Sequence, residues 1–306
     1  MSLSLIVNPH AGGGRAGREL GTVQAALTRL GLEHHVQTTR SLEHARELAV
    51  AAADAGEMAV AFGGDGLIGA VAEALCGRDG VLGALPGGRG NDLVRALGIP
   101  RELSRACEIL ATGTVGSIDL GQVGTRTFIG IASCGLDSIA NRIANETTLV
   151  RGNLVYAYGA LRALAAWRPA SFTVRVDGGE TRVVTGFTVA VANSNYYGGG
   201  MRLAPQASLS DGKLDLVIIH HMSKLKFLAL LPTVFRGTHV RYPQVEILRG
   251  ATIELAASER FTLYADGDPI AELPVTITVL PGAVRAMLPA GAGGMAGATA
   301  AATATL

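Results

Sequence analysis

Short apolar runs alternate with amphipathic segments over the first 120 residues of the chain. The runs at residues 3–7, 34–38, 58–62 and 81–85 have the length of β-strands. Apolar positions recur with helical spacing at 16–30, 42–55 and 67–75, and shorter helices are predicted at 92–97 and 102–111. Strands separated by helices of this length pair in parallel, with helices on both faces of the sheet. Residues 1–120 are therefore predicted to form an α/β domain with a parallel sheet.

The pattern changes after residue 113, where strand-like runs become more frequent. Strands are predicted at 116–123, 126–131, 171–177, 183–192, 213–219, 252–256, 260–265 and 275–280, and helical insertions at about 136–167 and 223–235. Asp177-Gly178-Gly179 is typical of a hairpin turn. Residues 121–280 are therefore predicted to form a mainly antiparallel β-sandwich. The Gly-, Ala- and Thr-rich tail at 291–306 is expected to be disordered.

Composition narrows the class of protein. The chain has 306 residues, 48% of them hydrophobic, and a formal net charge of +1 without a basic run, which argues against a nucleic-acid partner. No apolar run approaches the ~20 residues of a membrane-spanning helix, and the N-terminus lacks the basic region of a signal peptide. The three cysteines have no CxxC spacing and are expected to be reduced thiols. These features predict a cytoplasmic protein.

Three glycine-rich turns each follow a predicted strand of the first domain. They are Asn8–Gly14, Gly63–Gly66 and Pro86–Asp92. Turns that follow parallel strands meet at one edge of the sheet, where ligands bind. Glycine allows the backbone to approach a ligand and to direct N–H groups at phosphate oxygens, next to the N-terminus of the following helix. The three turns together predict a phosphate site.

Neither common nucleotide fingerprint is present, because GxxxxGK[ST] is absent and Gly12-Gly13-Gly14 does not begin a well-placed GxGxxG. The second turn instead contains a carboxylate, Asp65. A carboxylate beside a polyphosphate requires a cation between them, and Mg²⁺ prefers one or two carboxylates together with phosphates. The sequence therefore predicts a nucleotide with magnesium.

The order of these motifs along the chain resembles that of a known family. The motifs are Asn8-Pro9-x-x-Gly12, Gly63-Gly64-Asp65-Gly66, Pro86-Gly87-x-x-Gly90-Asn91-Asp92, Gly135-x-Asp137, Asp211-Gly212-Lys213-Leu214-Asp215 and Asp266-Gly267-Asp268-Pro269. They resemble the diacylglycerol kinase catalytic family, most of all its soluble bacterial lipid kinases, which are related to sphingosine kinases. The resemblance implies an ATP-binding first domain, a β-sandwich second domain, and an active site in the cleft between them. It also implies that residues 281–290 return to the first domain.

The resemblance further implies a set of nucleotide contacts. They are Asn8, Pro9, His10, Ala11, Gly12, Thr39, Gly63, Gly64, Asp65, Gly66, Leu67, Ile68, Gly69, Ala70, Arg89 and Asn91. Leu67 and Arg89 stand where the family usually has threonine, so two hydroxyl groups are missing from the site. Arg89 is expected to compensate by contacting a phosphate directly or to shift the nucleotide preference.

The catalytic residues implied by the resemblance are Asp65 at the magnesium ion, Asp92 at the nucleotide end and Asp268 as general base. The family usually has glutamate at Asp268, so Asp266 is the reserve base. If the preceding strand continues, Asp266 and Asp268 share one of its faces, and Pro269 ends it. The alternatives are a simple N-cap for Asp92 and an ordinary β-turn for Asp266-Gly267-Asp268-Pro269.

A second, non-catalytic Mg²⁺ site is implied at Asp211, with the backbone carbonyl groups of Ser208 and Lys213 as further ligands. The alternative is a plain turn around Asp211-Gly212. Four cations, Lys224, Lys226, Arg236 and Arg241, flank an apolar segment. This segment is either a transient contact with the membrane surface or an ordinary amphipathic helix.

The leading hypothesis is an ATP- and Mg²⁺-dependent lipid kinase, with diacylglycerol as the acceptor expected from the resemblance. It would be cytoplasmic and would act at the membrane periphery. Nothing in the sequence identifies the acceptor, so sphingosine, ceramide or a glycolipid stays open, as does a homodimer. The alternatives are an enzyme like NAD kinase and a catalytically inactive nucleotide-binding regulator, which Leu67 and Arg89 favour.

Overall fold

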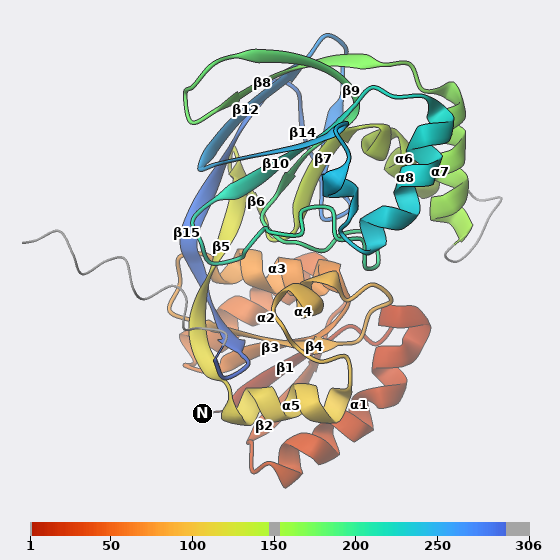
Figure 1. The fold of residues 1–306 in the computed structure, drawn as a ribbon. Helices are drawn as coiled ribbons and strands as arrows, with labels where there is room; N and C mark the ends of the chain where they lie inside the picture. Colours follow the sequence, from red (N-terminus) through yellow and green to blue (C-terminus); the bar gives the residue numbers. More distant parts are fainter. Residues whose placement is uncertain (1, 147–153, 292–306) are drawn as a thin grey trace, which may run out of the picture.

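The computed structural model describes residues 2–146 and 154–291 of the chain (Figure 1). In the first domain, β1 (Leu3–Val7), β2 (His34–Thr38), β3 (Met58–Gly63) and β4 (Val81–Pro86) form a parallel sheet in the order β4-β3-β1-β2. Every residue of β1, β3 and β4 is buried, as expected for strands covered on both faces. This explains why these strands appear in the sequence as continuous apolar runs.

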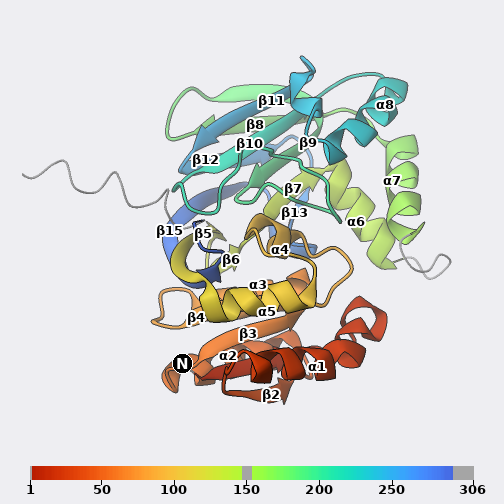
Figure 2. The same ribbon diagram turned by 60° about the horizontal axis from the view of Figure 1, so that its bottom comes forward.

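Helices cover both faces of this sheet. On one side α1 (Ala11–Arg29) packs with α5 (Leu103–Thr112), and on the other α2 (Leu42–Asp54) packs with α3 (Asp65–Leu75). The hydroxyl of Ser41 accepts a hydrogen bond from the His44 N–H group (3.1 Å) and so caps α2. The short α4 (Asp92–Ala96) follows β4, and α3 lies between the sheet and the second domain (Figures 1 and 2).

The second domain is a mainly antiparallel β-structure, so the predicted fold class is confirmed. Its strands are β5 (Thr114–Val123), β6 (Arg126–Phe128), β7 (Ile131–Gly135), β8 (Ala170–Val176), β9 (Arg182–Ala192), β10 (Leu214–His220), β11 (Val245–Gly250), β12 (Thr252–Ala257), β13 (Thr262–Ala265), β14 (Asp268–Glu272) and β15 (Val275–Leu288). Its helices are α6 (Leu136–Glu146), α7 (Leu154–Ala166), α8 (Lys224–Phe235) and the 3₁₀ turn η1 (His239–Arg241). None of the helices in the described residues is long and apolar enough to cross a membrane.

Two long strands, β5 and β15, run through both domains. The first part of β15 pairs with β12 and β5, and after an irregularity between Leu280 and Val284 its second part pairs in parallel with β4 at Arg285 and Ala286. Val284, Ala286, Met287 and Leu288 lie in the core of the first domain. The segment expected to return to the first domain is therefore the end of β15. The predicted boundary at residue 120 falls inside β5.

The predicted strand at 126–131 is wrong, because the structure divides it into β6 and β7. The N–H groups of Ile129, Gly130 and Ile131 all donate to the Asp266 carboxylate (3.0–3.2 Å), which takes these donors from strand pairing. A carboxylate distant in sequence thus breaks the strand, which a local pattern does not reveal.

The expectation that Asp266 and Asp268 share one face of a continuing strand is also wrong. Asp266 and Gly267 have positive φ angles of 53° and 97° and form the tight turn of a β13–β14 hairpin, in which Ala265 lies opposite Asp268. Pro269 is part of β14, which lies at the edge of the sheet, where a missing N–H donor costs little. The sequence did not predict β11 or β14. The predicted hairpin at Asp177-Gly178 is present between β8 and β9. The tail expected to be disordered lies outside the described residues, apart from Gly291.

Candidate active site

The three glycine-rich turns of the first domain touch one another at the carboxyl edge of the parallel sheet. A Cβ atom added to Gly12 would lie 2.6 Å from the Gly87 carbonyl oxygen, and one added to Gly88 would lie 2.5 Å from the Gly64 Cα. The Gly87 N–H group donates to the Gly63 carbonyl oxygen (2.8 Å). The convergence predicted from the sequence is therefore present, and glycine is required where the backbones meet.

The first turn has the backbone form of an anion site. Gly12, Gly13 and Gly14 have consecutive positive φ angles of 62°, 70° and 84°, so the regular part of α1 begins only after them. Successive N–H groups in such a conformation form a concave nest that binds anions. The Arg89 guanidinium lies above this turn, because a Cβ added to Gly13 would be 3.7 Å from Arg89 Nη2. The structure assigns Arg89 no hydrogen-bond or ion-pair partner within the described residues.

Asn91 shapes the third turn from inside. Its side chain is fully buried, its Oδ1 accepts from the Gly88 N–H group (2.8 Å), and its Nδ2 donates to the Gly88 carbonyl (3.0 Å). Its own backbone is left-handed, with a φ of 53°. Asn91 therefore holds the turn that faces the other two, and both ends of its amide are already occupied.

Asp65 is the first residue of α3 and lies where the turns meet. Its Oδ1 accepts from the Leu93 N–H group (2.9 Å), so it caps α4 from a distance. Its Oδ2 faces the third turn, since a Cβ on Gly90 would lie 3.0 Å from it. Burial raises the pKa of Asp65, while the Leu93 N–H group lowers it. One oxygen therefore has a fixed position, and the other faces the open turn.

Asp92 connects the two domains. Its Oδ2 accepts from the Gly199 N–H group (2.6 Å), and its Oδ1 pairs with Arg95 (3.2 Å). Neither oxygen accepts from a backbone N–H group of α4, so the alternative that Asp92 is a simple N-cap is wrong. Asp65 caps this helix instead, through the Leu93 N–H group. Burial raises the pKa of Asp92, and the charge of nearby Asp65 adds to the shift.

Across the cleft, the two aspartates of the β13–β14 turn have different surroundings. The Asp266 carboxylate is fully engaged by the three N–H groups of residues 129–131. Burial nevertheless raises its pKa to about 6. Asp268 is exposed and lines the same pocket as Asp65. Asp268, unlike Asp266, is therefore free to accept a proton from a substrate.

The pocket between the domains brings several predicted residues together with others that the sequence did not indicate. Its lining consists of Leu42, Arg46, Asp65, Gly66, Gly69, Ala70, Glu73, Leu120, Arg126, Thr127, Phe128, Ile129, Ala265, Asp266, Asp268 and Ile270. The buried hydroxyl of Thr127 has no hydrogen-bond partner within the described residues. The lining thus combines apolar side chains with two arginines and several carboxylates.

Some of the predicted nucleotide contacts do not face open space. The side chains of Leu67, Ile68 and Ala70 are buried, and Leu67 fills the position beside Gly63 that a threonine hydroxyl would leave free. Thr39 follows β2 at the same sheet edge, where its N–H group donates to the Val7 carbonyl (2.8 Å). The backbone N–H groups of Leu67 (3.0 Å) and Ile68 (3.2 Å) also donate to the Gly64 carbonyl, whereas Gly69 and Ala70 line the pocket between the domains.

Comparisons with known proteins agree with this arrangement. Residues 2–123 match the diacylglycerol kinase catalytic domain, and residues 130–288 match the YegS C-terminal NAD kinase beta sandwich-like domain. The chain is 33% identical to a diacylglycerol kinase of Mycobacterium tuberculosis, over 94% of this chain and 95% of that protein. It is 31% identical to the diacylglycerol kinase of Bacillus subtilis, over 88% and 90% of the two chains. The chain belongs to the diacylglycerol kinase catalytic family.

A solved structure shows the same fold. It is a putative diacylglycerol kinase from Bacillus anthracis, with a TM-score of 0.79 at 20% identity, over 94% of this chain and 95% of that chain. The relatives named above are kinases, and the protein is a lipid kinase. The alternative of an enzyme like NAD kinase is supported only by similarity of fold, in the sandwich domain and in a solved NAD kinase structure from Archaeoglobus fulgidus with a TM-score of 0.50 at 15% identity, over 95% of this chain and 92% of that chain.

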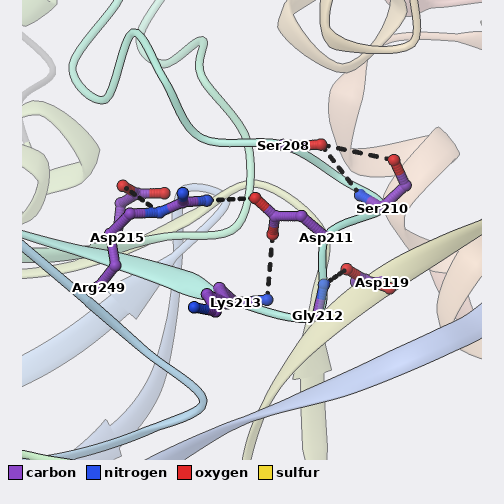
Figure 3. Close-up of polar contacts among 8 residues, drawn as sticks. All are labelled: Asp119, Ser208, Ser210, Asp211, Gly212, Lys213, Asp215 and Arg249. Carbon is purple, nitrogen blue, oxygen red and sulfur yellow. Dashed lines mark hydrogen bonds and ion pairs between the residues drawn. The ribbon is translucent and has the colours of Figure 1, made fainter. Parts of the chain in front are cut away.

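The predicted second metal site of this lipid kinase contains an arginine (Figure 3). Asp211 Oδ1 accepts from the Lys213 N–H group (3.1 Å), and its Oδ2 bonds to Arg249. Arg249 also pairs with the buried Asp215 (3.2 Å). With both carboxylate oxygens engaged, the residues as placed favour the turn alternative, and the metal site stays a prediction. No group of three or more His, Cys, Asp or Glu side chains in the described residues is arranged to hold a metal.

Asp119 is an interdomain residue that the sequence reasoning missed. It is buried in β5 and accepts from the N–H groups of Gly212 (2.8 Å) and Gly282 (2.7 Å). Burial raises its pKa, against the effect of these donors. The sequence does contain a signal for this role. Asp119 stands between Ile118 and Leu120 in an apolar strand, and a buried aspartate normally has partners.

Proposed function

We propose that this lipid kinase transfers the γ-phosphoryl group of ATP to the hydroxyl group of diacylglycerol, with Mg²⁺ as the required ion. The observation that carries the proposal is one pocket with Asp65 beside the three converging turns on one wall and Asp268 on the other. Phosphoryl transfer needs chiefly positioning and charge stabilisation, and this arrangement supplies groups for both.

In the proposed reaction the nest at Gly12–Gly14 and the Arg89 guanidinium hold the phosphates. The Asp65 carboxylate fits Mg²⁺ as a single protein ligand, because its Oδ1 is fixed by Leu93 and its Oδ2 faces the turn. The ion would neutralise charge on the phosphate oxygens. Asp92 keeps the sandwich domain against the nucleotide end through Gly199.

The acceptor enters from the opposite side of the pocket. Asp268 accepts the proton of its hydroxyl as the new oxygen–phosphorus bond forms and the bond from the γ-phosphorus to ADP breaks. The apolar side chains of Leu42, Leu120, Phe128 and Ile270 line this pocket and suit an acyl chain. This chemistry supports a glycerolipid as the acceptor.

The test is incubation with radiolabelled ATP, Mg²⁺ and a panel of lipids in micelles. We expect labelled phosphatidic acid from diacylglycerol, less label on sphingosine and ceramide, and none on NAD. If another lipid alcohol is labelled as strongly as diacylglycerol, the proposed substrate is wrong. Label on NAD alone would overturn the proposal. If ATP binds but no acceptor is labelled, the proposed reaction is wrong.

A further inference from the structure

Helix α8 is apolar on two opposite sides. Its inner side buries Phe227, Leu230 and Val234, and Phe227 stacks on Phe187 with ring centroids 4.5 Å apart. The outer side, here called the α8 face, is exposed and consists of Leu225, Lys226, Ala229, Pro232, Phe235 and Arg236. Leu225 is 80% exposed and Phe235 is 54% exposed. A surface helix normally has a polar outer side. The exposed apolar side chains of this face therefore indicate a surface that binds a partner.

Charge defines what kind of partner fits. The sequence from His221 to Val245 contains no aspartate or glutamate. Within the described residues, Lys226, Arg236 and Arg241 have no ion-pair partner, and all three side chains are exposed. The exposed Val240 and Tyr242 extend the apolar surface beyond α8. The region thus combines apolar side chains with uncompensated positive charge.

Helix α8 lies next to elements that border the active site. The Val234 carbonyl of α8 accepts from the Arg202 N–H group (3.0 Å), and Gly199, three residues before Arg202, donates to Asp92. At the other end of α8, Lys224 Nζ donates to the Ala165 carbonyl of the neighbouring α7 (2.7 Å; Figures 1 and 2). Leu161, one helical turn before Ala165, is 58% exposed, so α7 also presents an apolar side chain to solvent.

We propose that the α8 face binds the surface of an anionic lipid bilayer and thereby brings the interdomain pocket to substrate within that bilayer. This inference rests on the proposed function, since a lipid acceptor is the reason to bind there. Exposed aliphatic and aromatic side chains flanked by lysine and arginine match the interface of anionic lipids. A symmetric contact with a second copy fits poorly. A two-fold axis would bring the lysine and arginine side chains of the two copies together, and this face has no aspartate or glutamate to pair with them.

The test is cosedimentation with vesicles of phosphatidylcholine alone or mixed with phosphatidylglycerol. The unmodified protein binds the mixed vesicles more tightly, and added salt weakens this preference. Removing two positive charges in Lys226→Gln/Arg236→Gln weakens binding to mixed vesicles by about 25-fold, at roughly fivefold per cation. Leu225→Ser/Phe235→Ser weakens binding to both kinds of vesicle by about tenfold or more.

Val183→Ser is the matched control. Val183 is 71% exposed and is the second residue of β9, beside the β8–β9 turn. The β8–β9 turn lies at the opposite end of the sandwich from α8 (Figures 1 and 2). The Val183→Ser variant should leave vesicle binding unchanged. Unchanged binding in both α8 variants, or no binding by the unmodified protein, overturns the proposal. A dimer that the Leu225→Ser/Phe235→Ser variant converts to monomers overturns it in favour of a second copy.

Activity on a short-chain, water-soluble diacylglycerol separates this inference from the proposed function. We expect every α8 variant to keep the kcat of the unmodified protein on that substrate and to lose activity only on vesicles. If the unmodified protein phosphorylates neither form, the proposed function fails. If it phosphorylates the soluble form while the α8 variants act normally on vesicles, only the docking surface fails.

Discussion

Two aspartates at the β13–β14 turn, separated by one residue, show that neighbouring side chains of the same type can have different roles because their surroundings differ. Asp266 uses its carboxylate to hold the segment at residues 129–131, whereas Asp268 is exposed and lines the pocket. A general base needs a free oxygen within reach of the substrate proton. At the scale of single residues, the position of each oxygen matters more than the residue type.

For Asp268→Asn we expect kcat to fall by on the order of 10²-fold or more, because the amide cannot accept the proton. The KM for ATP should change little. The matched control is Glu272→Gln on the same strand, whose carboxylate accepts from Thr262 outside the pocket and should tolerate the change. Steady-state kinetics give both values. An active Asp268→Asn together with a folded but inactive Asp266→Asn would mean that the wrong carboxylate is assigned.

Asp65→Ala should reduce turnover below detection while the secondary structure is retained. It removes the only protein ligand proposed for the ion, and it also removes the cap of α4, which costs about 1 kcal/mol of stability. Circular dichroism monitors the fold, and a labelled-phosphate assay measures turnover. Substantial remaining activity would remove Asp65 from the mechanism.

Arg89→Ala should raise the KM for ATP by about 10-fold or more, since a charge-assisted hydrogen bond contributes roughly 1.5–3 kcal/mol. Arg78→Ala, an exposed arginine after α3, is the matched control. Isothermal titration with ATP measures the affinity directly. An unchanged affinity would mean that Arg89 does not compensate for the missing threonine hydroxyl.

Asp137 on α6 makes a prediction about pH. Burial raises the pKa of its carboxyl to about 6, although Thr188 donates to it (2.8 Å). The folded state therefore binds this proton more tightly than the unfolded state, so the free energy of unfolding falls as pH rises from about 4 to about 6. Above that range the free energy of unfolding is lower by about 3 kcal/mol, because the pKa of Asp137 is raised by about two units.

Asp137→Asn should remove this loss. Its free energy of unfolding in urea should exceed that of the unmodified protein at pH 8 by up to about 3 kcal/mol, with no gain at pH 4. Glu259→Gln, at an exposed site, should follow the unmodified protein at both values. If the free energies of unfolding of Asp137→Asn and the unmodified protein differ by the same amount at pH 4 and pH 8, the pH effect does not come from Asp137.

At the scale of elements, the parts of the fold that depend on local pattern were predictable and the parts set by distant contacts were not. β1 and β2 match their predicted limits, and the three glycine turns meet as expected, because apolar runs and glycine follow local rules. The break between β6 and β7 depends on Asp266, more than 130 residues away in sequence. The Gly199 contact to Asp92 and the role of Asp119 likewise join segments with no local signal.

The Asp211 turn carries the prediction that remains open at this scale. If it binds Mg²⁺ as predicted, Asp211 must exchange its bond to Arg249 for the ion (Figure 3). Mg²⁺ without nucleotide should then raise the Tm of the unmodified protein by a few degrees, because it binds only the folded state. Asp211→Ala should lose this rise, whereas Asp65→Ala should keep it.

Thermal unfolding followed by fluorescence measures both variants. A Tm that does not respond to Mg²⁺ in the unmodified protein, with equal destabilisation by Asp211→Ala and Arg249→Gln, would establish a plain turn held by an arginine.

At the scale of the whole molecule, β5 and β15 tie the domains into one continuous sheet, and Asp119 joins them to the Asp211 turn. The core of the first domain includes Val284, Ala286 and Leu288 from the end of the chain. Removal of everything after residue 280 should therefore destabilise the first domain as well as the sandwich. We expect full-length protein to unfold in one transition in urea, and the truncated chain to lose most of its native circular dichroism. A truncated chain with a native-like first domain would contradict this.

The last strand also has a consequence for synthesis on the ribosome. The strand that completes the sheet of the first domain, at Arg285 and Ala286 beside β4, is translated about 200 residues after β4. At about 5–20 residues per second, the nascent chain exposes the β4 edge for on the order of ten seconds before its partner exists. During that interval an unpaired strand edge is open to other chains. Chaperones that shield nascent chains are therefore expected to matter more for this protein than for one whose first domain closes on itself.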